Sequence, residues 1–483
     1  MPSGRSTTLA TGGEPTSAHP PGFRLRRGRN WFFLGLTYAS YYLCRYNLGP
    51  VAPELMRDLG LKPSEYGLIR TFRDGAYAIG QMVNGLFTDR LGGKKAMTIG
   101  AVATILLNLA FGWAAWSNLG PLLLSVLVSI RMADGYFQAF GAPGFIKINT
   151  AWFRRKERGA FAGIFGAMIN LGAAGAPQLA KLLATGFVIP LGVFTLACPQ
   201  LDWRYVFMIP PIFVAVVILL MNIFVKNTPE EAGFRVEHDE EQGETSTERV
   251  RLRDVWRKIA SNRIVWIVAA AYFCTGFVRS AIEGWWAKYL EDIWNAGKAS
   301  GPYDALSWGL PITATLGSLC SGLVSDRFFG GRRAPVAATL YFSQLCFTLI
   351  ALAIPHDGSV QGPWLAVIAV IGIAMLCNST HSILGTAAAM DLGGTKMAGC
   401  ASGIIDSFQY YGGMFSGFGL GVLFEATYRS AASQPTTTGS AEAGHIPIDP
   451  TVWFGSMVPF GIMGTVLMGY LWLRHHGTDT RGT

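Results

Sequence analysis

Long apolar runs without charge alternate with short charged stretches along most of the chain. Residues 96–130, 205–225 and 451–473 contain no Asp, Glu, Lys or Arg. Each run meets the requirement of about 20 apolar residues for a helix that crosses a bilayer. The runs show no alternation with a period of two residues, so helices are predicted and a membrane β-barrel is not. The pattern therefore predicts a polytopic helical membrane protein.

Twelve membrane-spanning helices are predicted from these runs. They cover residues 31–53, 64–88, 96–116, 119–148, 158–186, 203–225, 263–290, 303–325, 334–354, 362–388, 397–424 and 452–473. The stretch 182–201 is uncharged and is interrupted by Pro190 and Pro199. It is predicted to form a long extracytoplasmic connection or a re-entrant segment.

Composition agrees with a membrane protein. Of the 483 residues, 51% are hydrophobic and 14% are charged, whereas soluble proteins average roughly 25% charged residues. The seven cysteines are scattered without a C-x-x-C pair, so neither a metal site nor a disulfide framework is indicated. No phosphate-binding loop of the Walker type is present, which argues against an ATP-driven pump. We therefore expect no cofactor and no enzymatic activity.

The net charge of +9 predicts topology and not nucleic-acid binding. In the twelve-span arrangement, the basic clusters fall on one side of the membrane, at residues 24–29, 94–95, 154–158, 332–333 and 474 and in the central linker. This positive-inside pattern places both termini in the cytoplasm. The expected location is the plasma membrane, which in a bacterium is the inner membrane. We expect the chain to be embedded in its lipid bilayer.

The chain repeats itself weakly, which predicts two homologous halves. GLFTDRLGGKKA at 85–96 resembles GLVSDRFFGGRRA at 322–334, Arg45 has a counterpart in Arg279, and residues 159–163 resemble 399–403, at offsets of 234 to 240 positions. The predicted layout is a disordered cytoplasmic tail at 1–30, a six-helix half at 31–225, a cytoplasmic linker at 226–262, a second six-helix half at 263–474 and a cytoplasmic tail at 475–483.

Two such halves are typical of a transporter whose substrate site lies between them near the bilayer midplane. The D-R loops resemble the signature of the major facilitator superfamily, and this resemblance implies an all-α fold of twelve transmembrane helices in two pseudo-symmetric halves. It also implies that Asp89, Arg90, Asp326 and Arg327 form cytoplasmic gating contacts that break on inward opening. The alternative is that Asp89 and Arg90 anchor helix ends at the interface.

Arg45 and Arg279 are the strongest candidates for substrate binding. Each lies in an apolar span, where an arginine costs about 2.5–3.5 kcal/mol on insertion scales. The guanidinium grips phosphate or carboxylate through two parallel hydrogen bonds and keeps its charge. Two arginines at matching places in the halves therefore predict a clamp for a dianion. The alternative is neutralisation by a nearby acid, for which Glu283 is available to Arg279.

YASYYLCRYN at 38–47, the two D-R loops, WFRRKERG at 152–159 and FVRSAIEGWWAKYL at 277–290 resemble the organophosphate:phosphate antiporters of that superfamily. The resemblance runs from about residue 31 to residue 425. It implies that Arg45 and Arg279 bind the phosphoryl group, that Tyr38, Tyr42 and Tyr77 line the site, and that an organic phosphate is exchanged for inorganic phosphate. Tyr38, Tyr42 and Arg45 share one helical face in any case.

Two family residues are missing. The lysine that glycerol phosphate transporters carry in the second span corresponds to Gln81, and their histidine in the fifth span corresponds to Ile169, next to Asn170. The organic group or the coupling mode can therefore differ. A relative that senses hexose phosphate without transporting it shares much of the pattern, so a membrane sensor and a carrier of another organic anion, such as a carboxylate, stay open.

The second span carries a polar face that predicts a pathway lining. Arg70, Asp74, Tyr77, Gln81, Asn84 and Thr88 follow helical spacing. We hypothesise that Arg73 supplies the positive charge that Gln81 lacks and that Asp74 orients or balances it. The alternative is that these charged side chains reach the extracytoplasmic surface.

Two further ionisable residues lie in spans. His381 could titrate or bind substrate, although a single helix histidine is often structural, and Asp406 is a candidate for selectivity. The predicted function is exchange of an organic phosphate for inorganic phosphate by alternating access, carried out by a monomer and driven by solute gradients.

Overall fold

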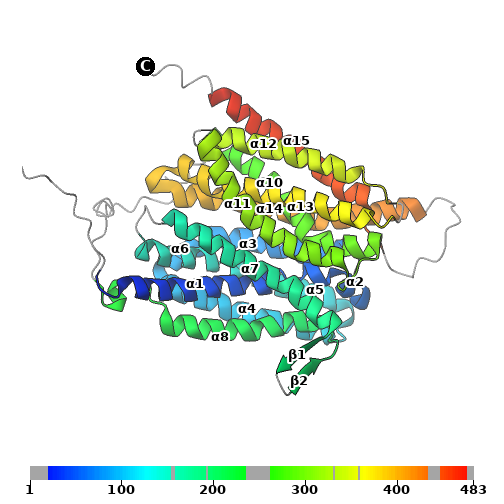
Figure 1. Cartoon of the computed structure of the whole chain (residues 1–483), viewed down its shortest axis with the longest axis horizontal. Coiled ribbons are helices and arrows are strands. Elements are labelled where there is room, and N and C mark those ends of the chain that lie inside the picture. The colour runs from blue at the N-terminus through cyan, green and yellow to red at the C-terminus, as the bar shows by residue number, and fades with distance from the viewer. Residues whose placement is uncertain are drawn as a thin grey trace, which may run out of the picture.

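The computed structural model describes residues 20–153, 158–191, 194–234, 261–329, 332–356, 359–432 and 446–475 (Figure 1). The first half contains α1 (Phe23–Arg45), α2 (Ala52–Leu59), α3 (Pro63–Leu91), α4 (Gly93–Trp116), α5 (Leu123–Gln138), α6 (Gly141–Trp152), α7 (Arg158–Thr185) and α8 (Ile209–Phe224). The second half contains α10 (Arg263–Trp294), α11 (Gly301–Phe328), α12 (Arg333–Leu352), α13 (Gly362–Ser382), α14 (Ala389–Ala432) and α15 (Pro450–His475). Short 3₁₀ turns occur at η1 (Gly49–Val51), η2 (Gly120–Leu122), η3 (Trp203–Phe207) and η4 (Glu230–Ala232).

The fold is that of an all-α polytopic membrane protein. Seven helical stretches in the described residues are long and apolar enough to cross a membrane: Gly93–Trp116, Gly120–Trp152, Trp203–Phe224, Arg263–Trp294, Arg333–Leu352, Gly362–Gly385 and Pro450–Arg474. The long helices α1 and α3 are not among them. Both carry charged and polar side chains within their length.

The first span differs from its predicted extent at both ends. Helix α1 begins at Phe23, so the prediction of a disordered tail over 1–30 is wrong for residues 23–30. Phe23 is buried, stacks on Trp152 and meets Phe234 edge-on, which fixes the start of the helix. The helix ends at Arg45, and the chain bends before η1 and α2.

The uncertain stretch 182–201 folds as an extension of α7 and a β-hairpin. Strands β1 (Phe187–Leu191) and β2 (Phe194–Cys198) pair antiparallel, with Leu191 opposite Phe194. Gly186, with a φ of 69°, makes the turn out of the helix. The hairpin projects sideways from the bundle below the end of α7 (Figure 1), and it connects α7 to η3.

The predicted break between the spans 362–388 and 397–424 is absent. Helix α13 continues through the π-helix η6 (Ile383–Ala388) directly into α14. The predicted fourth span is instead divided, because α5 ends at Gln138 and α6 begins at Gly141.

The two halves lie side by side, with α1–α8 in one layer and α10–α15 in the other (Figure 1). The start of α1 and the end of α15 lie at one end of the bundle, here called the terminal end, whereas α2 and the hairpin lie at the opposite, distal end. Helices α3 and α14 approach very closely: a Cβ at Gly67 would lie 2.3 Å from the carbonyl oxygen of Gly417.

Among the residues that the structure describes, three ion pairs join the halves at the distal end. Arg57 Nη1 lies 3.0 Å from Glu291 Oε1, Lys181 Nζ lies 2.5 Å from Asp304 Oδ1, and Lys298 pairs with Glu54. No comparable ion pair between the halves occurs at the terminal end within the described residues. The molecule is therefore closed at its distal end.

Candidate functional site

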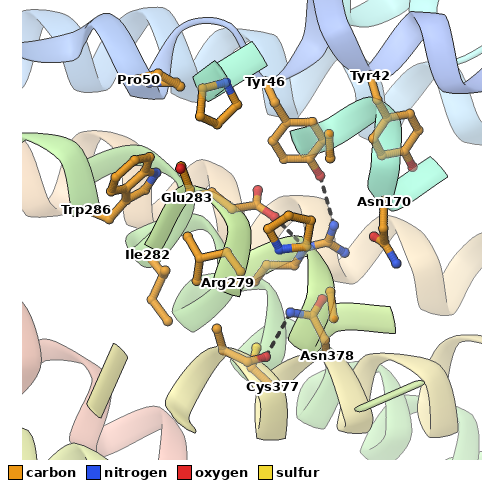
Figure 2. Close-up of a pocket in the computed structure, with 17 residues that line it drawn as sticks. Tyr42, Tyr46, Pro50, Asn170, Arg279, Ile282, Glu283, Trp286, Cys377 and Asn378 are labelled. Atoms are coloured by element: carbon orange, nitrogen blue, oxygen red, sulfur yellow. Dashed lines mark hydrogen bonds and ion pairs between the residues drawn. The ribbon is translucent and has the colours of Figure 1, made fainter. Parts of the chain in front are cut away.

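A cavity lies between the halves. Residues of α1, η1 and α7 form one wall, and residues of α10, α11 and α13 form the other (Figure 2). The lining residues are Tyr42, Tyr46, Pro50, Asn170, Ala173, Pro177, Arg279, Ile282, Glu283, Trp286, Ser307, Leu310, Pro311, Ala314, Ala374, Cys377 and Asn378. This position between the halves is where a transporter holds its substrate.

Arg279 lines the cavity and is held from three directions. Its Nε donates to Glu283 Oε1 at 2.7 Å, and its Nη2 donates to the hydroxyl of Tyr46 at 2.9 Å (Figure 2). Its Nη1 lies 3.4 Å from His381 Nε2. The pairing with Glu283 is the one that the alternative interpretation predicted. The bond to Tyr46 links the second half to the first at the level of the cavity.

Arg45 is buried beside Tyr42 and is not itself part of the cavity wall. Its Nε donates to Gln138 Oε1 at 2.9 Å, and its guanidinium carbon lies 4.9 Å and 4.3 Å from the ring centres of Tyr42 and Tyr77. Its Nη2 is buried and has no hydrogen-bond partner among the residues that the structure describes. No carboxylate in the described part of the chain pairs with it. This cation is therefore held by neutral groups alone.

A buried polar network lies behind Arg45. Gln138 Nε2 donates to both oxygens of Asp134 at 3.0 Å, and Asp134 Oδ2 pairs with Arg131 Nη1 at 3.0 Å. Arg131 Nη2 in turn donates to Asn47 Oδ1 at 2.6 Å. Asp134 is thus neutralised by Arg131, and Gln138 links it to Arg45.

The predicted tyrosines surround Arg45. Tyr42 stacks on Tyr46 with 5.4 Å between ring centres, whereas Tyr38 is buried against Phe145 at 5.7 Å. Of the tyrosines predicted to line the site, only Tyr42 is in the described cavity wall. Tyr38 lies behind it.

Helix α3 contributes Tyr77 and Gln81 on the face toward α14. Gln81 Nε2 donates to the Tyr77 hydroxyl at 2.9 Å, and the Tyr77 ring lies 4.3 Å from that of Tyr410. Neither Tyr77 nor Gln81 is in the described cavity wall. The structure therefore brings Tyr77 to Arg45 from a second helix.

Arg73 and Asp74 are buried and lie outside the described wall. Arg73 Nε is 3.6 Å from Asp74 Oδ1, and their side chains are 12% and 7% exposed. Arg70 donates to the carbonyl and hydroxyl oxygens of Ser280 on α10 at 2.9 Å and 2.8 Å. These side chains lie within the bundle, so the prediction that they reach the surface does not describe this conformation.

The other candidates are divided between wall and interior. Asn170 lines the cavity and donates to Thr315 Oγ1 at 2.8 Å. His381 is bonded to the Tyr272 hydroxyl and lies next to Arg279, outside the wall. Asp406 on α14 is partly buried and is also outside the wall.

The D-R loops make no gating contact among the described side chains. Asp89 is exposed, and Lys147 of the same half approaches its Oδ1 at 3.4 Å. Arg90 and Arg327 are exposed, and the side chain of Asp326 lies outside the described residues.

Sequence reasoning missed several residues of this site. Tyr46 continues the row of Tyr38 and Tyr42 at spacing i+4, so this spacing could have identified it. Gln138, Asn378 and Tyr410 stand in segments without a motif and come together only through tertiary packing.

Comparison with known proteins identifies a family whose model this chain matches. The model of the Major Facilitator Superfamily matches residues 34–417. The glycerol-3-phosphate transporter of Bacillus subtilis is 26% identical over 405 residues, which cover 80% of this chain and 84% of that protein. A hexose-6-phosphate:phosphate antiporter and the membrane sensor protein UhpC, both of Salmonella typhimurium, are each 25% identical, over 82% and 81% of this chain and 82% and 84% of their own lengths.

A solved structure agrees on the fold. The crystal structure of a bacterial homologue of the human lysosomal transporter Spinster, inward-facing and unoccupied, matches with a TM-score of 0.65. The match covers 96% of this chain and 97% of that one at 15% identity. At this identity the likeness shows the fold alone.

Proposed function

We propose that this chain, which belongs to the major facilitator superfamily, exchanges an organic phosphate for inorganic phosphate by alternating access. Membership and the similar proteins named as transporters indicate a membrane transporter and not an enzyme. The similar proteins named for glycerol and hexose phosphates support organophosphate transport. Exchange with inorganic phosphate is the proposed step.

The main support for the proposal is that the Arg45 guanidinium lacks a charged partner among the described residues. A guanidinium in the interior of a membrane protein is costly unless it has a partner. Within the described residues, however, Arg45 forms no ion pair and its buried Nη2 makes no hydrogen bond. Phosphate supplies the charge and the acceptor oxygens that this group lacks. Its position next to Tyr42 puts it immediately behind the cavity wall.

Arg279 completes the clamp from the other half. Its contacts with Tyr46, His381 and Glu283 use all three nitrogens. A phosphate that binds Arg279 replaces one or more of these contacts, and the bond to Tyr46 is the one that joins the halves. Substrate binding thereby replaces a contact between the two halves with contacts to the ligand. This replacement links substrate binding to the movement of one half relative to the other.

The direction of opening follows from the predicted topology. With both termini in the cytoplasm, the ion pairs at the distal end close the cavity to the outside. The observed conformation is then the one that faces inward. Reporter fusions at the two termini test this orientation.

Exchange can be measured in proteoliposomes loaded with unlabelled phosphate. We expect the purified chain to take up labelled external phosphate without ATP and to require internal phosphate or a phosphate ester. Liposomes with an Arg45→Ala, Arg279→Ala variant are the control. Carboxylate uptake that is indifferent to phosphate would instead identify a carrier of another organic anion.

The second candidate is a membrane sensor of phosphate esters, because the sensor protein UhpC is as similar to this chain as the antiporter is. A sensor binds phosphate ester with an affinity that depends on Arg45 and Arg279 but produces no flux. Binding without exchange in the same proteoliposomes selects this function.

A further inference from the structure

Glu283 places a carboxylate in the cavity wall beside the phosphate-binding arginine. It lies one turn after Arg279 on α10, and its Oε1 accepts the hydrogen bond from Arg279 Nε. Its second oxygen, Oε2, has no protein donor in the described part of the chain, and the side chain is 31% exposed. Oε2 is therefore free to accept a hydrogen bond from a molecule in the cavity (Figure 2).

Two amide oxygens of the wall are free in the same way. The Thr315 hydroxyl donates to the Pro311 carbonyl at 3.0 Å, so it must accept from the Asn170 amide nitrogen. The Asn378 nitrogen donates to the Ala374 carbonyl at 2.8 Å. These bonds fix which atom of each amide is nitrogen. Neither amide oxygen has a donor among the described residues, so the wall offers three acceptor oxygens with Glu283.

Aromatic rings complete this surface. Trp286 follows Glu283 by three positions on α10, and Tyr42 and Tyr46 stand in the opposite wall. Aromatic faces attract cations through the ring quadrupole. Acceptor oxygens together with aromatic faces form an environment for an ammonium group, which has only donors.

Charge balance points the same way. Arg279 is the one cation and Glu283 the one carboxylate among the described lining residues of the cavity. A phosphate dianion that binds Arg279 and Arg45 leaves Glu283 without a counter-charge in this wall, and a charge without a partner in a partly enclosed site is unfavourable. A site for a plain anion would be better without this carboxylate, whereas a substrate that brings one positive charge balances it.

We infer that the organic part of the substrate carries an ammonium group, so that the preferred substrate is a zwitterionic phosphate ester, such as the phosphate ester of an amino alcohol. The ammonium binds at Glu283 and at the oxygens of Asn170 and Asn378, while the phosphoryl group binds the arginines. The inference rests on the proposed function for its phosphate end.

Binding to the purified full chain tests the inference without requiring flux. Isothermal titration measures the Kd of ethanolamine phosphate and the Kd of glycerol 3-phosphate. In the ratio of the two Kd values, any change in affinity for the phosphate group that both esters share cancels. We expect the zwitterionic ester to bind at least about tenfold more tightly, and the preference to disappear in Glu283→Gln. Glu291→Gln, two turns further along α10 and outside the cavity wall, serves as the control and should keep the preference.

Equal binding of the two esters by the unchanged chain, or a preference that survives Glu283→Gln, would overturn the inference. Phosphate exchange in proteoliposomes is scored separately. Exchange without preference for the zwitterion leaves the proposed function intact and removes the inference alone. Binding of the zwitterion through Glu283 without exchange would support the inference and contradict the proposed exchange. Failure of every phosphate ester to bind would contradict both the inference and the proposed function.

Discussion

The two membrane arginines are related by the repeat but are held differently. Arg279 pairs with an acid, whereas the contacts of Arg45 in the described part of the chain are with the neutral Gln138 and two tyrosine faces. The difference makes Arg45 the stronger anion site in the empty protein. It also makes Arg279 the residue whose contacts must rearrange when substrate arrives.

Replacement of either arginine by lysine tests the clamp. Lysine keeps the charge and loses the planar fork, and a hydrogen bond to a charged group contributes about 1.5–3 kcal/mol. We expect Arg45→Lys and Arg279→Lys each to reduce phosphate exchange at least about tenfold, with unchanged elution of the purified protein on size exclusion. Exchange at the original rate and affinity would remove that residue from the clamp.

Gln138 is expected to position Arg45 for its ligand. Gln138→Leu removes the bond to Arg45 Nε and the donor to Asp134. We expect the KM for phosphate to rise about tenfold, which corresponds to about 1.4 kcal/mol, with a smaller effect on kcat. Gln344→Leu is the matched control, since Gln344 is equally buried but lies on α12. An equal rise in KM in both variants would indicate a general loss of packing.

Arg73 remains a proposed contributor of positive charge near Tyr77. It lies outside the described cavity wall in the conformation closed at the distal end, so it can meet the substrate only after rearrangement. We expect Arg73→Gln to weaken phosphate affinity about tenfold and bound phosphate to protect a cysteine at this position from a polar thiol reagent. Unchanged affinity together with equal labelling would assign Arg73 a structural role.

At the scale of elements, close backbone approaches determine how the halves meet. Helix α3 meets α14 through Gly67, Gly417 and Gly421, where added Cβ atoms would lie within 3.0 Å of backbone or side-chain atoms of the other helix. Such contacts involve backbone atoms, which cannot rotate away as side chains do. The interface therefore requires glycine for its closed form.

Gly67→Ala should open the distal end. Its Cβ would lie 2.3 Å from the Gly417 carbonyl oxygen, so α3 and α14 must separate. Spin labels on cysteines at Asn118 and Ala299, which are exposed distal residues of the two halves, should show a longer mean distance. Gly85→Ala on the same helix has open space around its Cβ and should leave the distance unchanged. A distance unaffected by Gly67→Ala would mean that the helices adjust locally.

The apolar runs predicted most of the helices, because length and hydropathy are local properties of the sequence. Helix ends at Phe23 and Arg45, the division between α5 and α6, and the continuous α13–α14 segment depend on tertiary contacts. At the site, the cost of a charged residue in an apolar span singled out Arg45 and Arg279. Gln138 and Asn378 are ordinary polar residues in their helices, so only the structure shows what they contact.

At the scale of the whole molecule, the halves are joined between the cavity and the distal end. Ion pairs link α2 to α10 and its following loop, and α7 to α11. The Arg57–Glu291 and Lys181–Asp304 pairs are partly exposed, and exposed ion pairs contribute roughly 0–1 kcal/mol each, so these two can break and form again during transport. The Lys298–Glu54 pair is more buried, with side chains 7% and 19% exposed. Alternating access requires that all of them separate when the distal end opens.

A cross-link at the distal end should therefore stop exchange. In a cysteine-free background, Arg57→Cys with Glu291→Cys replaces the pair whose charged atoms are 3.0 Å apart, one in each half. A short, reducible bifunctional thiol reagent should hold the halves together. We expect phosphate exchange to fall at least tenfold and to recover on reduction.

The control is Asp58→Cys with Arg204→Cys, a neighbouring pair within the first half whose charged atoms are 4.0 Å apart. Its cross-link should leave exchange intact. Undiminished exchange by molecules shown to be cross-linked between residues 57 and 291 would mean that the halves do not separate at this end, and the alternating-access mechanism proposed from this conformation would have to be abandoned.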